Sequence, residues 1–392
     1  GPGRDNLRAY ALLVLAVLAA GVAAGASRLA LAKLLRDDLG ASVLVVSSLT
    51  SWFMLARALS SAIGGLGALS SPQAWRLLLS LPLAGIAVIV YAIPGLGDPL
   101  PILALNALWG LLSGLVWPQA QAAAGAALPG RPGAAVSVYF ATGTLGMSLG
   151  QYLYGATEAS NASVVRASSL LFLASAALMA LVSGMVPRPA PRGLKGLEAV
   201  RIRSVDRVSA WIILAAFSTG YTAGILREFL YVYLGEVYGL SREALGSVLA
   251  LSGLAALAAS LAVGPLADRL GTARVLSMVL VVGALGGLAL GLSHAVWQAF
   301  LGLVLAQAAA RSSMPLTRNI AAFNHPQALA FVGFSNTFSS IGQMTGPLAA
   351  GVLYDKLGGV TILMVPGAGL PFITAGALMA ATVVLYRIAV AR

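Results

Sequence analysis

The sequence predicts an all-α membrane protein with twelve transmembrane helices arranged in two pseudo-symmetric halves of six. Hydrophobic residues make up 59% of its 392 residues and charged residues only 9%, whereas a soluble domain carries about 25% charged residues. A bilayer core needs roughly 20 apolar residues per helix, and twelve such stretches can be found. The third observation is an internal repeat, in which landmarks of the first half recur in the second.

The repeat has a nearly constant offset. Gly21, Gly25, Arg28 and Gly40 recur 199 positions later, and Gly64 and Leu66 recur 200 positions later. The later landmarks recur after 197 or 196 positions, and they are Pro118 with Pro315, Gly146 with Gly342, Gly150 with Gly346, and Gly155 with Gly351. Duplicated hydrophobic halves are typical of transporters, which place the substrate site near the interface of the repeats.

The predicted spans divide the chain into two bundles and a linker. The first six spans are 9–34, 42–66, 75–96, 100–125, 134–157 and 165–186. The second six are 208–233, 243–264, 273–292, 295–316, 328–353 and 360–386. We therefore expect an N-terminal bundle over 1–186, a polar, proline-containing linker over 187–207, and a C-terminal bundle over 208–392.

The composition also excludes several kinds of chemistry. There is no cysteine and there are only two histidines, so we expect neither a metal site nor another cofactor. No phosphate-binding loop is present, so ATP does not drive the protein directly. Ser148 fits a G-x-S-x-G pattern, but it lies in the middle of an apolar span, so we predict no enzyme activity. The opening Gly-Pro-Gly is interpreted as a tag remnant, and the first apolar stretch as a retained helix.

The distribution of Lys and Arg predicts the orientation in the cell membrane. With both termini and the linker in the cytoplasm, five basic residues lie outside: Lys33, Arg36, Arg166, Arg242 and Lys356. Fifteen lie inside: Arg4, Arg8, Arg76, Arg131, Arg188, Arg192, Lys195, Arg201, Arg203, Arg207, Arg269, Arg274, Arg318, Arg387 and Arg392. Topology thus accounts for the net charge of +12 without nucleic-acid binding.

One motif is specific enough to indicate a resemblance to a known family. Between the eighth and ninth predicted spans the chain reads Gly264-Pro-Leu-Ala-Asp268-Arg269-Leu-Gly271-Thr-Ala-Arg274. This segment resembles the G-x-L-a-D-R-x-G-x-x-R signature of the major facilitator superfamily, whose members are secondary transporters that work by alternating access. The resemblance implies the major facilitator fold and a gating role for the motif. We expect Gly264 to permit close helix approach, Gly271 to form a tight turn, and Asp268 to cap a helix or pair with an arginine as a latch.

The first-half counterpart of the motif has Ala68 where the family has aspartate, so the expected latch is asymmetric. Glycines spaced four apart in spans 5 and 11 are predicted to allow close helix packing. The drug antiporters of the superfamily carry a G-x-x-x-G-P run in helix 5. Here the proline, Pro347, follows Gly346 in span 11, and the matching residue of span 5 is Gln151.

Five ionisable residues fall inside the predicted spans, more than two positions from either end: Arg28, Arg57, Arg227, Glu228 and Arg311. A buried arginine costs about 2.5–3.5 kcal/mol on insertion scales, so each indicates a cavity role or a structural pair. The excess of positive charge favours an anionic substrate. Arg28 and Arg227 occupy equivalent places in spans 1 and 7, and two planar guanidinium groups suit a phosphate or carboxylate. This arrangement resembles that of the organophosphate/phosphate antiporters of the superfamily.

Alternatives remain for each of these residues. Arg28 and Arg227 could snorkel to water from the outer ends of their helices, and Arg57 and Arg311 could mark the cytoplasmic boundary. Glu228 is a candidate proton-coupling group or half of a structural pair. Polar and aromatic residues that could line a cavity include Asn106, Trp109, Tyr139, Tyr221, Gln307, Asn336 and Gln343.

The sequence therefore predicts a monomeric secondary transporter, symporter or antiporter, for a small organic or phosphorylated anion. Its candidate substrate-binding residues are Arg28, Arg57, Arg227, Arg311, Tyr221 and Gln343. The alternative is a proton-driven exporter of multiple drugs or lipophilic compounds that uses Glu228 as the proton carrier.

Overall fold

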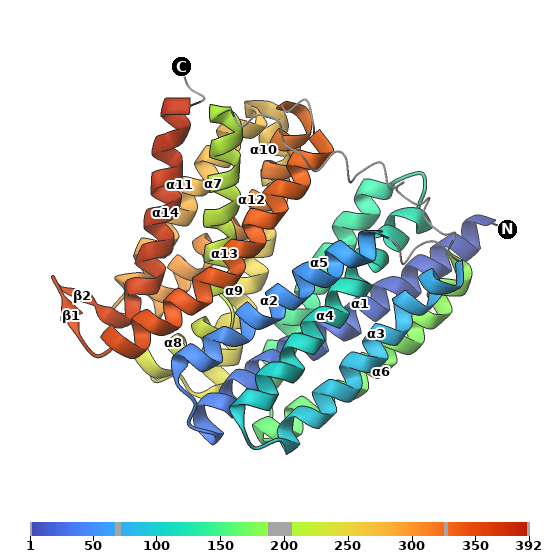
Figure 1. Ribbon diagram of the computed structural model, residues 1–392, viewed down its shortest axis with the longest axis horizontal. Coiled ribbons are helices and arrows are strands. Elements are labelled where there is room, and N and C mark those ends of the chain that lie inside the picture. The colour runs from blue at the N-terminus through green and yellow to red at the C-terminus, as the bar shows by residue number, and fades with distance from the viewer. Residues whose placement is uncertain (1, 67–71, 187–205, 325–327, 390–392) are drawn as a thin grey trace. The chain divides into compact units, whose positions relative to one another are not determined.

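The computed structural model describes residues 2–66, 72–186, 206–324 and 328–389, and nearly all of them are helical (Figure 1). In the first half the helices are α1 (Pro2–Lys33), α2 (Val43–Leu66), α3 (Pro72–Ala92), α4 (Pro99–Ala127), α5 (Pro132–Ala156) and α6 (Asn161–Met185). In the second half they are α7 (Arg207–Ile225), α8 (Glu228–Val237), α9 (Arg242–Leu261), α10 (Val263–Leu270), α11 (Thr272–Gly291), α12 (Val296–Asn324), α13 (Ala328–Leu357) and α14 (Leu370–Ala389). Short elements are η1 (Leu34–Asp38), η2 (Ile93–Gly95), η5 (Gly367–Gly369), β1 (Thr361–Ile362) and β2 (Val365–Pro366).

These elements account for the twelve expected spans. Ten spans correspond to α1 to α6, α11, α12, α13 and α14, while α7 with α8 and α9 with α10 each form one interrupted span. Nine helical segments of the described residues are long and apolar enough to cross a membrane by length and composition. The helices α5, α12 and α13 fall outside that set, and each is rich in Gly, Ser, Thr or Gln or carries arginine.

The chain forms two compact units. Unit 1 comprises Gly1–Ala41, Trp52–Arg192 and Ser241–Ala250, and unit 2 comprises Ser42–Ser51, Gly193–Leu240 and Leu251–Arg392. The ten-residue segments Ser42–Ser51 and Ser241–Ala250 are the beginnings of α2 and α9, and they are exchanged between the units. Their numbers differ by 199 at both ends (241 − 42 and 250 − 51), which is the offset of the sequence repeat.

In unit 1, α1 packs against α5 and α6, and α3 packs against α4 and α6 (Figure 1). The contact between α1 and α5 is made by glycines. A Cβ added at Gly21 would lie 2.9 Å from the carbonyl oxygen of Gly143, and one added at Gly150 would lie 2.1 Å from the carbonyl oxygen of Val22. Neither position has room for a side chain, so the packing role expected for the span 5 glycines is confirmed.

Unit 2 repeats this arrangement, with α7 packed against α13 and α11 packed against α12 and α14. A Cβ at Gly220 would lie 2.0 Å from the carbonyl oxygen of Ser339, and one at Gly342 would lie 2.3 Å from that of Phe217. The glycines that recur in the sequence therefore make equivalent helix contacts in both units. Beside this contact lies a core of buried apolar side chains that includes Trp211, Leu280 and Met379.

Two of the predicted spans differ from the structure. The expected span 208–233 is interrupted at Leu226 and Arg227, where the backbone leaves the helical conformation between α7 and α8. The expected span 360–386 is wrong in its first ten residues, because 360–369 form the β1–β2 hairpin and a 3₁₀ turn before α14. Pro366, Gly367 and Gly369 explain this difference, since proline and glycine disfavour a helix interior. Ala68 and linker residues 187–205 lie outside the described residues.

Candidate functional site

Arg28 of α1 is the most enclosed of the predicted substrate-binding residues, with 3% of its surface exposed. Its guanidinium carbon lies 4.7 Å from the centre of the Phe53 ring and 5.0 Å from that of the Trp109 ring. One terminal nitrogen donates a hydrogen bond to the side-chain oxygen of Asn106. Three helices, α1, α2 and α4, thus fix the plane of this guanidinium. We call Arg28, Phe53, Asn106 and Trp109 the Arg28 cluster.

Close packing of α2 against α4 builds the cluster. A Cβ at Gly110 would lie 2.2 Å from the carbonyl oxygen of Phe53, and one at Gly114 would lie 2.4 Å from that of Arg57. These glycines bring the backbones together, so the ring of Trp109 meets the Phe53 ring edge-on at 6.1 Å. Trp109 also meets Phe172 edge-on at 5.6 Å, which supports the cluster from α6.

Arg57 lies on α2 one turn beyond Phe53 and is half-buried. Its backbone carbonyl accepts a hydrogen bond from the hydroxyl of Ser60. The Arg57 charge is close enough to Tyr139 of α5 to act on it electrostatically, and the Tyr139 hydroxyl donates to the carbonyl oxygen of Trp117 at 3.3 Å. Unit 1 therefore holds two of the four intramembrane arginines, Arg28 and Arg57, on adjacent helices.

In unit 2, Arg227 occupies the break between α7 and α8. Its backbone angles, φ −116° and ψ −124°, are not helical, and Glu228 begins the next helix. The side chain of Arg227 is half-buried. Tyr221, 7% exposed, shares a hydrogen bond of 3.2 Å with the hydroxyl of Thr374 on α14. Gln343 is half-buried on α13, and its carbonyl oxygen would lie 2.8 Å from a Cβ at Gly224.

Glu228 is almost fully buried, with 1% exposed. Its carboxylate accepts a hydrogen bond from the hydroxyl of Thr50, which lies in the α2 segment that belongs to unit 2. In the same segment the hydroxyl of Ser51 donates to the carbonyl oxygen of Met344 at 2.7 Å. The structural pair expected for Glu228 therefore includes a hydroxyl group, which can donate to an ionised carboxylate.

The Ser42–Ser51 segment is also held at its beginning. Both carboxylate oxygens of Asp355 accept backbone N–H groups at the start of α2, from Val43 at 3.1 Å and from Leu44 at 2.9 Å. The first N–H groups of a helix have no partner within it, so Asp355 supplies a cap from another helix. The equivalent segment of unit 1 is held differently, because Arg242 donates to the Tyr154 carbonyl oxygen at 2.9 Å and stacks on the Tyr154 ring at 4.0 Å.

Arg311 is half-buried on α12 of unit 2. Further along the same helix, α12 forms a narrow polar crevice with α7 and α13, lined by Ala216, Thr219, Met314, Thr317, Ser335, Asn336 and Ser339. The hydroxyl of Thr219 is buried and has no hydrogen-bond partner among the described residues. Arg318 donates to the side-chain oxygen of Asn336 at 3.0 Å. The crevice is thus the second place where an arginine is oriented by an asparagine.

The motif of the 264–274 segment forms the short helix α10 and the turn into α11. Gly271 has φ +90°, a backbone conformation that favours glycine, and its expected role in a tight turn is confirmed. No heavy atom among the described residues lies within 4 Å of a Cβ at Gly264, so the close helix approach expected there is not seen. Asp268, Arg269 and Arg274 are exposed, and the latch expected for Asp268 stays a prediction.

The structure therefore groups the predicted residues by unit. Arg28 and Arg57 lie in unit 1, whereas Arg227, Glu228, Tyr221, Gln343 and Arg311 lie in unit 2. Among the described residues, no group of three His, Asp, Glu or Cys side chains could hold a metal ion. Sequence reasoning missed Phe53 and Thr50. No local pattern marks either residue, because each acts on a helix far away in the sequence.

Comparison with known proteins shows what part of the chain resembles. Residues 212–391 match the model of the Major Facilitator Superfamily. Over 303 residues, 74% of each chain, the protein is 23% identical to the multidrug resistance protein MdtG of Salmonella paratyphi B. A crystal structure of the nucleoside transporter NupG superposes with a TM-score of 0.79 at 12% identity, covering 97% of this chain and 100% of that one. The human organic anion transporter MFSD10 (TETRAN) gives 0.64 at 18% identity, covering 98% and 99%.

The two solved structures are named as transporters of nucleosides and of organic anions, so they share the fold but not the cargo. Four observations agree with the major facilitator fold: the twelve spans, the repeated units, the 264–274 motif and the family match. Residues 212–391 thus match the model of the Major Facilitator Superfamily, the chain has the fold of these solved transporters, and its described helices are long and apolar enough to cross a membrane several times.

Proposed function

We propose that the protein is a secondary active transporter that moves a small organic or phosphorylated anion across the cell membrane by alternating access. The observation that carries this proposal is the Arg28 cluster. Its guanidinium is buried, and two aromatic rings and one amide hold it in a defined plane. An arginine aligned in advance loses less conformational freedom when it binds a ligand.

The chemistry of this group favours an oxyanion. A guanidinium presents its donors in a rigid fork that matches the two oxygens of a carboxylate or phosphate. Aromatic faces stabilise the cation without providing a hydrogen-bond acceptor, so Phe53 and Trp109 orient the group without occupying its donors. Asn106 is uncharged, so its contact with one terminal nitrogen leaves the positive charge of the group in place. Arg28 therefore fits a recognition role better than a snorkelling role.

Arg227 supports the same proposal from unit 2. Transporters commonly build their substrate and ion sites where a transmembrane helix is interrupted, because free backbone groups are tolerated only beside a cavity. The interruption between α7 and α8 falls at Leu226 and Arg227, and Arg227 is the repeat equivalent of Arg28. We propose that Arg28 and Arg227 bind the anion, and that Arg57, Arg311, Tyr221 and Gln343 contribute further contacts.

Net charge within the spans agrees with an anionic cargo. The interiors of the predicted spans, more than two positions from either end, contain four arginines and one glutamate, which favours anions in a cavity of low dielectric constant. The name of MFSD10, an organic anion transporter, is consistent with this assignment. We further propose that the protein acts as a monomer with both termini in the cytoplasm, as the charge distribution indicates.

A second candidate function has its own support. The buried carboxylate of Glu228 accepts a hydrogen bond from Thr50, and an intramembrane carboxylate is a common proton carrier. The relative MdtG is named a multidrug resistance protein. Proton-driven export of lipophilic compounds, with Glu228 as the proton carrier, is therefore the alternative.

A thermal-shift screen of the purified protein separates the two candidates. A ligand that binds the native state raises the melting temperature, and the shift grows with the logarithm of ligand concentration relative to Kd. The panel contains inorganic phosphate, glycerol 3-phosphate and small carboxylates on one side and lipophilic cations such as ethidium on the other. Stabilisation by at least one anion, lost in the Arg28→Lys variant, supports the proposal. Stabilisation by the lipophilic cations alone would contradict it and favour the alternative.

A further inference from the structure

The connection between α13 and α14 differs from its repeat equivalent. In unit 1 the chain passes from α5 to α6 through the polar residues 157–160, which include Glu158. In unit 2 the corresponding connection covers 358–369 and contains the β1–β2 hairpin. No charged residue occurs between Lys356 and Arg387. Duplication therefore does not account for the hairpin, and its composition is unusual for a loop at the end of a membrane helix.

The tip of the hairpin is apolar and exposed. Leu363 and Met364 form the two-residue turn between Ile362 and Val365, and they are 93% and 90% exposed. Their φ angles are +50° and +68°, and they are the only non-glycine residues with positive φ in the part of the chain that the structure describes. Such a turn ordinarily carries Asn-Gly, because a side chain is disfavoured at positive φ. Two large, exposed apolar side chains thus occupy a turn whose backbone conformation disfavours them.

The base of the hairpin is fixed to the helices of unit 2. Gly367 donates its N–H to the carbonyl oxygen of Val360 at 2.8 Å, and a Cβ at Gly367 would overlap the end of α13. A Cβ at Gly369 would overlap the end of α11 at Gly291. The tip is therefore held at a set position, where it projects sideways from α13 and α14 (Figure 1).

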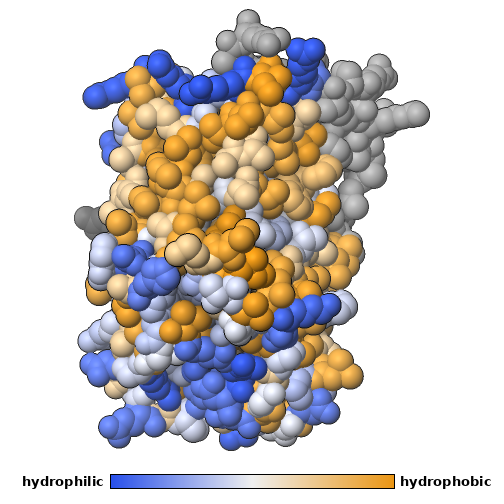
Figure 2. Space-filling model, turned by 90° about the vertical axis from the view of Figure 1, so that its left-hand side faces the viewer, coloured by the Kyte–Doolittle hydropathy of each residue, from blue (hydrophilic) through white to orange (hydrophobic). Residues whose placement is uncertain are grey.

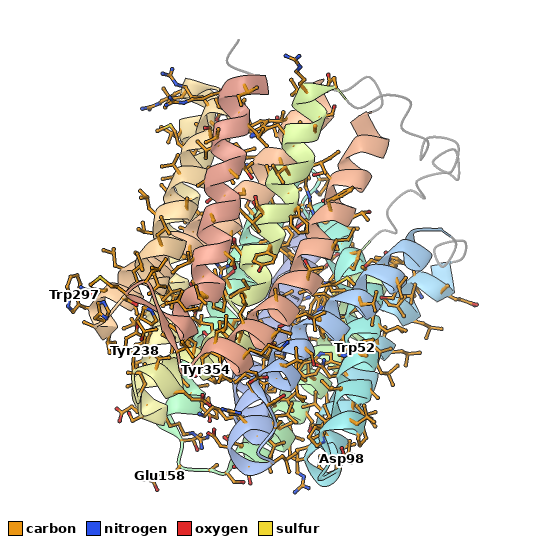
Figure 3. All side chains as sticks on the ribbon, turned by 60° about the vertical axis from the view of Figure 1, so that its left-hand side comes forward. Trp52, Asp98, Glu158, Tyr238, Trp297 and Tyr354 are labelled. Carbon is orange, nitrogen blue, oxygen red and sulfur yellow. The ribbon has the colours of Figure 1, made fainter. Side chains whose placement is uncertain are left out.

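The hairpin lies on a side of the molecule with a broad apolar region (Figure 1 and Figure 2). Figure 2 shows this side of the molecule, where a broad hydrophobic region lies between hydrophilic residues at its upper and lower ends. Trp297, at the start of α12, is 67% exposed and points away from the helices, with Tyr238 and Tyr354 below it (Figure 3). Tyr238 and Tyr354 direct their hydroxyls to Ser293 and to Glu236. Trp and Tyr are enriched where a membrane meets water.

We infer that the β1–β2 hairpin is a membrane anchor, whose residues Leu363 and Met364 insert into the lipid at the interface marked by Trp297. Lipid suits this surface as its occupant because both tip residues are apolar and exposed and no charged residue occurs between Lys356 and Arg387. If the tip lay in water, nothing would offset the conformational cost of placing two apolar side chains in this turn. In lipid, their transfer out of water offsets the strain. This inference is independent of the transported substrate.

The absence of cysteine from the chain allows a direct test. Single variants Leu363→Cys and Met364→Cys are spin-labelled and reconstituted in phosphatidylethanolamine and phosphatidylglycerol vesicles. Collision rates are then measured with oxygen, which concentrates in lipid, and with a water-soluble nickel chelate. Leu285→Cys, at an exposed apolar position in the middle of α11, is the lipid control, and Glu158→Cys is the aqueous control.

The expected ratio of oxygen to chelate collisions at 363 and 364 is severalfold above that at Glu158 and close to that at Leu285. A ratio like that at Glu158 would place the tip in water and overturn the inference. Low collision rates with both reagents would show that protein covers the tip, as in contact with a second copy, and would also overturn it.

A second variant tests whether the apolar side chains cause the insertion. The double substitution Leu363→Asn with Met364→Gly keeps a sequence that suits the turn. A label at Thr361→Cys reports on the neighbouring strand. Chelate collisions at this label should rise severalfold in the double variant, while the melting temperature in detergent should stay at or above that of the parent. Unchanged collisions in a folded double variant would overturn the inference.

Discussion

The guanidinium of Arg28 donates a hydrogen bond to the side-chain oxygen of Asn106, which lies 78 positions further along the chain. The guanidinium carbon also lies over the rings of Phe53 and Trp109, so three side chains restrict the position in which Arg28 can meet a ligand. In the proposed mechanism Asn106 is a positioning residue, and its own neutrality matters because it leaves the charge of Arg28 available to the anion.

Replacing Asn106 with aspartate should therefore weaken anion binding. Asn106→Asp keeps the size of the side chain but places a carboxylate beside Arg28, where it competes with the anion. We expect the affinity for the anion identified by thermal shift to fall by about tenfold or more, which is about 1.4 kcal/mol. Isothermal titration of the purified variant measures this change.

The chain offers a matched control for this variant. Asn336 accepts a hydrogen bond from Arg318 at 3.0 Å, so Asn336→Asp adds the same charge to a second arginine–asparagine pair. Affinity should then change by less than about threefold, or 0.7 kcal/mol. Equal losses of anion affinity in the two variants would mean that the added charge acts at long range. This result would contradict a specific role of Arg28 in binding.

Thr50 should stabilise the buried carboxylate of Glu228. Thr50→Val removes the donor while keeping the shape of the side chain, so the free energy of unfolding should fall by about 1.5–3 kcal/mol, the range for a hydrogen bond to a charged group. In the Glu228→Gln background the acceptor is neutral, and the same substitution should cost about 0.5–1.5 kcal/mol. Unfolding titrations in SDS compare the four proteins. An equal cost in both backgrounds would indicate that Glu228 is protonated in the folded protein.

Two glycines should differ sharply in their tolerance of alanine. A Cβ at Gly220 would lie 2.0 Å from the backbone of α13, whereas a Cβ at Gly264 meets no described atom within 4 Å. Gly220→Ala should lower the free energy of unfolding by about 1–3 kcal/mol, as overpacking does, and Gly264→Ala should change it by about 0.5 kcal/mol or less. If both variants unfold alike, the contact between α7 and α13 does not limit stability.

Asp268 should act in transport more than in binding. The 264–274 segment matches the superfamily's gating signature, while the first-half copy has Ala68. Asp268→Asn removes one charge from an exposed position, so folding and ligand affinity should remain close to those of the parent. The rate of substrate exchange in proteoliposomes should fall. If the variant exchanges substrate as fast as the parent, Asp268 does not act as a latch.

Much of the fold could be predicted because its signals are local or periodic. Apolar length identified the spans, and the repeated glycines predicted close helix packing, whereas the partners, α1 with α5 and α7 with α13, come from the structure. The break at Arg227 could not be predicted, since neither Pro nor Gly occupies it. The β1–β2 hairpin could not be predicted either, because its residues are as apolar as those of a transmembrane span.

The candidate site was predicted in part. The arginines stand out in apolar spans because their burial is costly, and Asn106 and Trp109 were recognised as candidates to line a cavity. Their contact with Arg28 depends on which helices pack together, and Gly110 and Gly114 decide this through backbone approach. A single sequence does not reveal such pairings, so Phe53 and Thr50 could not be assigned.

The central claim is that Arg28 and Arg227 bind the transported anion through planar guanidinium groups. Arg→Lys at either position keeps the positive charge and removes the fork. Titration of the anion found by thermal shift into the parent, the two single variants and the double variant tests this claim most directly. The account predicts that each single substitution weakens binding by about 1.5–3 kcal/mol, or roughly one to two decades in affinity, while Glu228→Gln has little effect. Unchanged anion affinity in the double lysine variant would contradict the account.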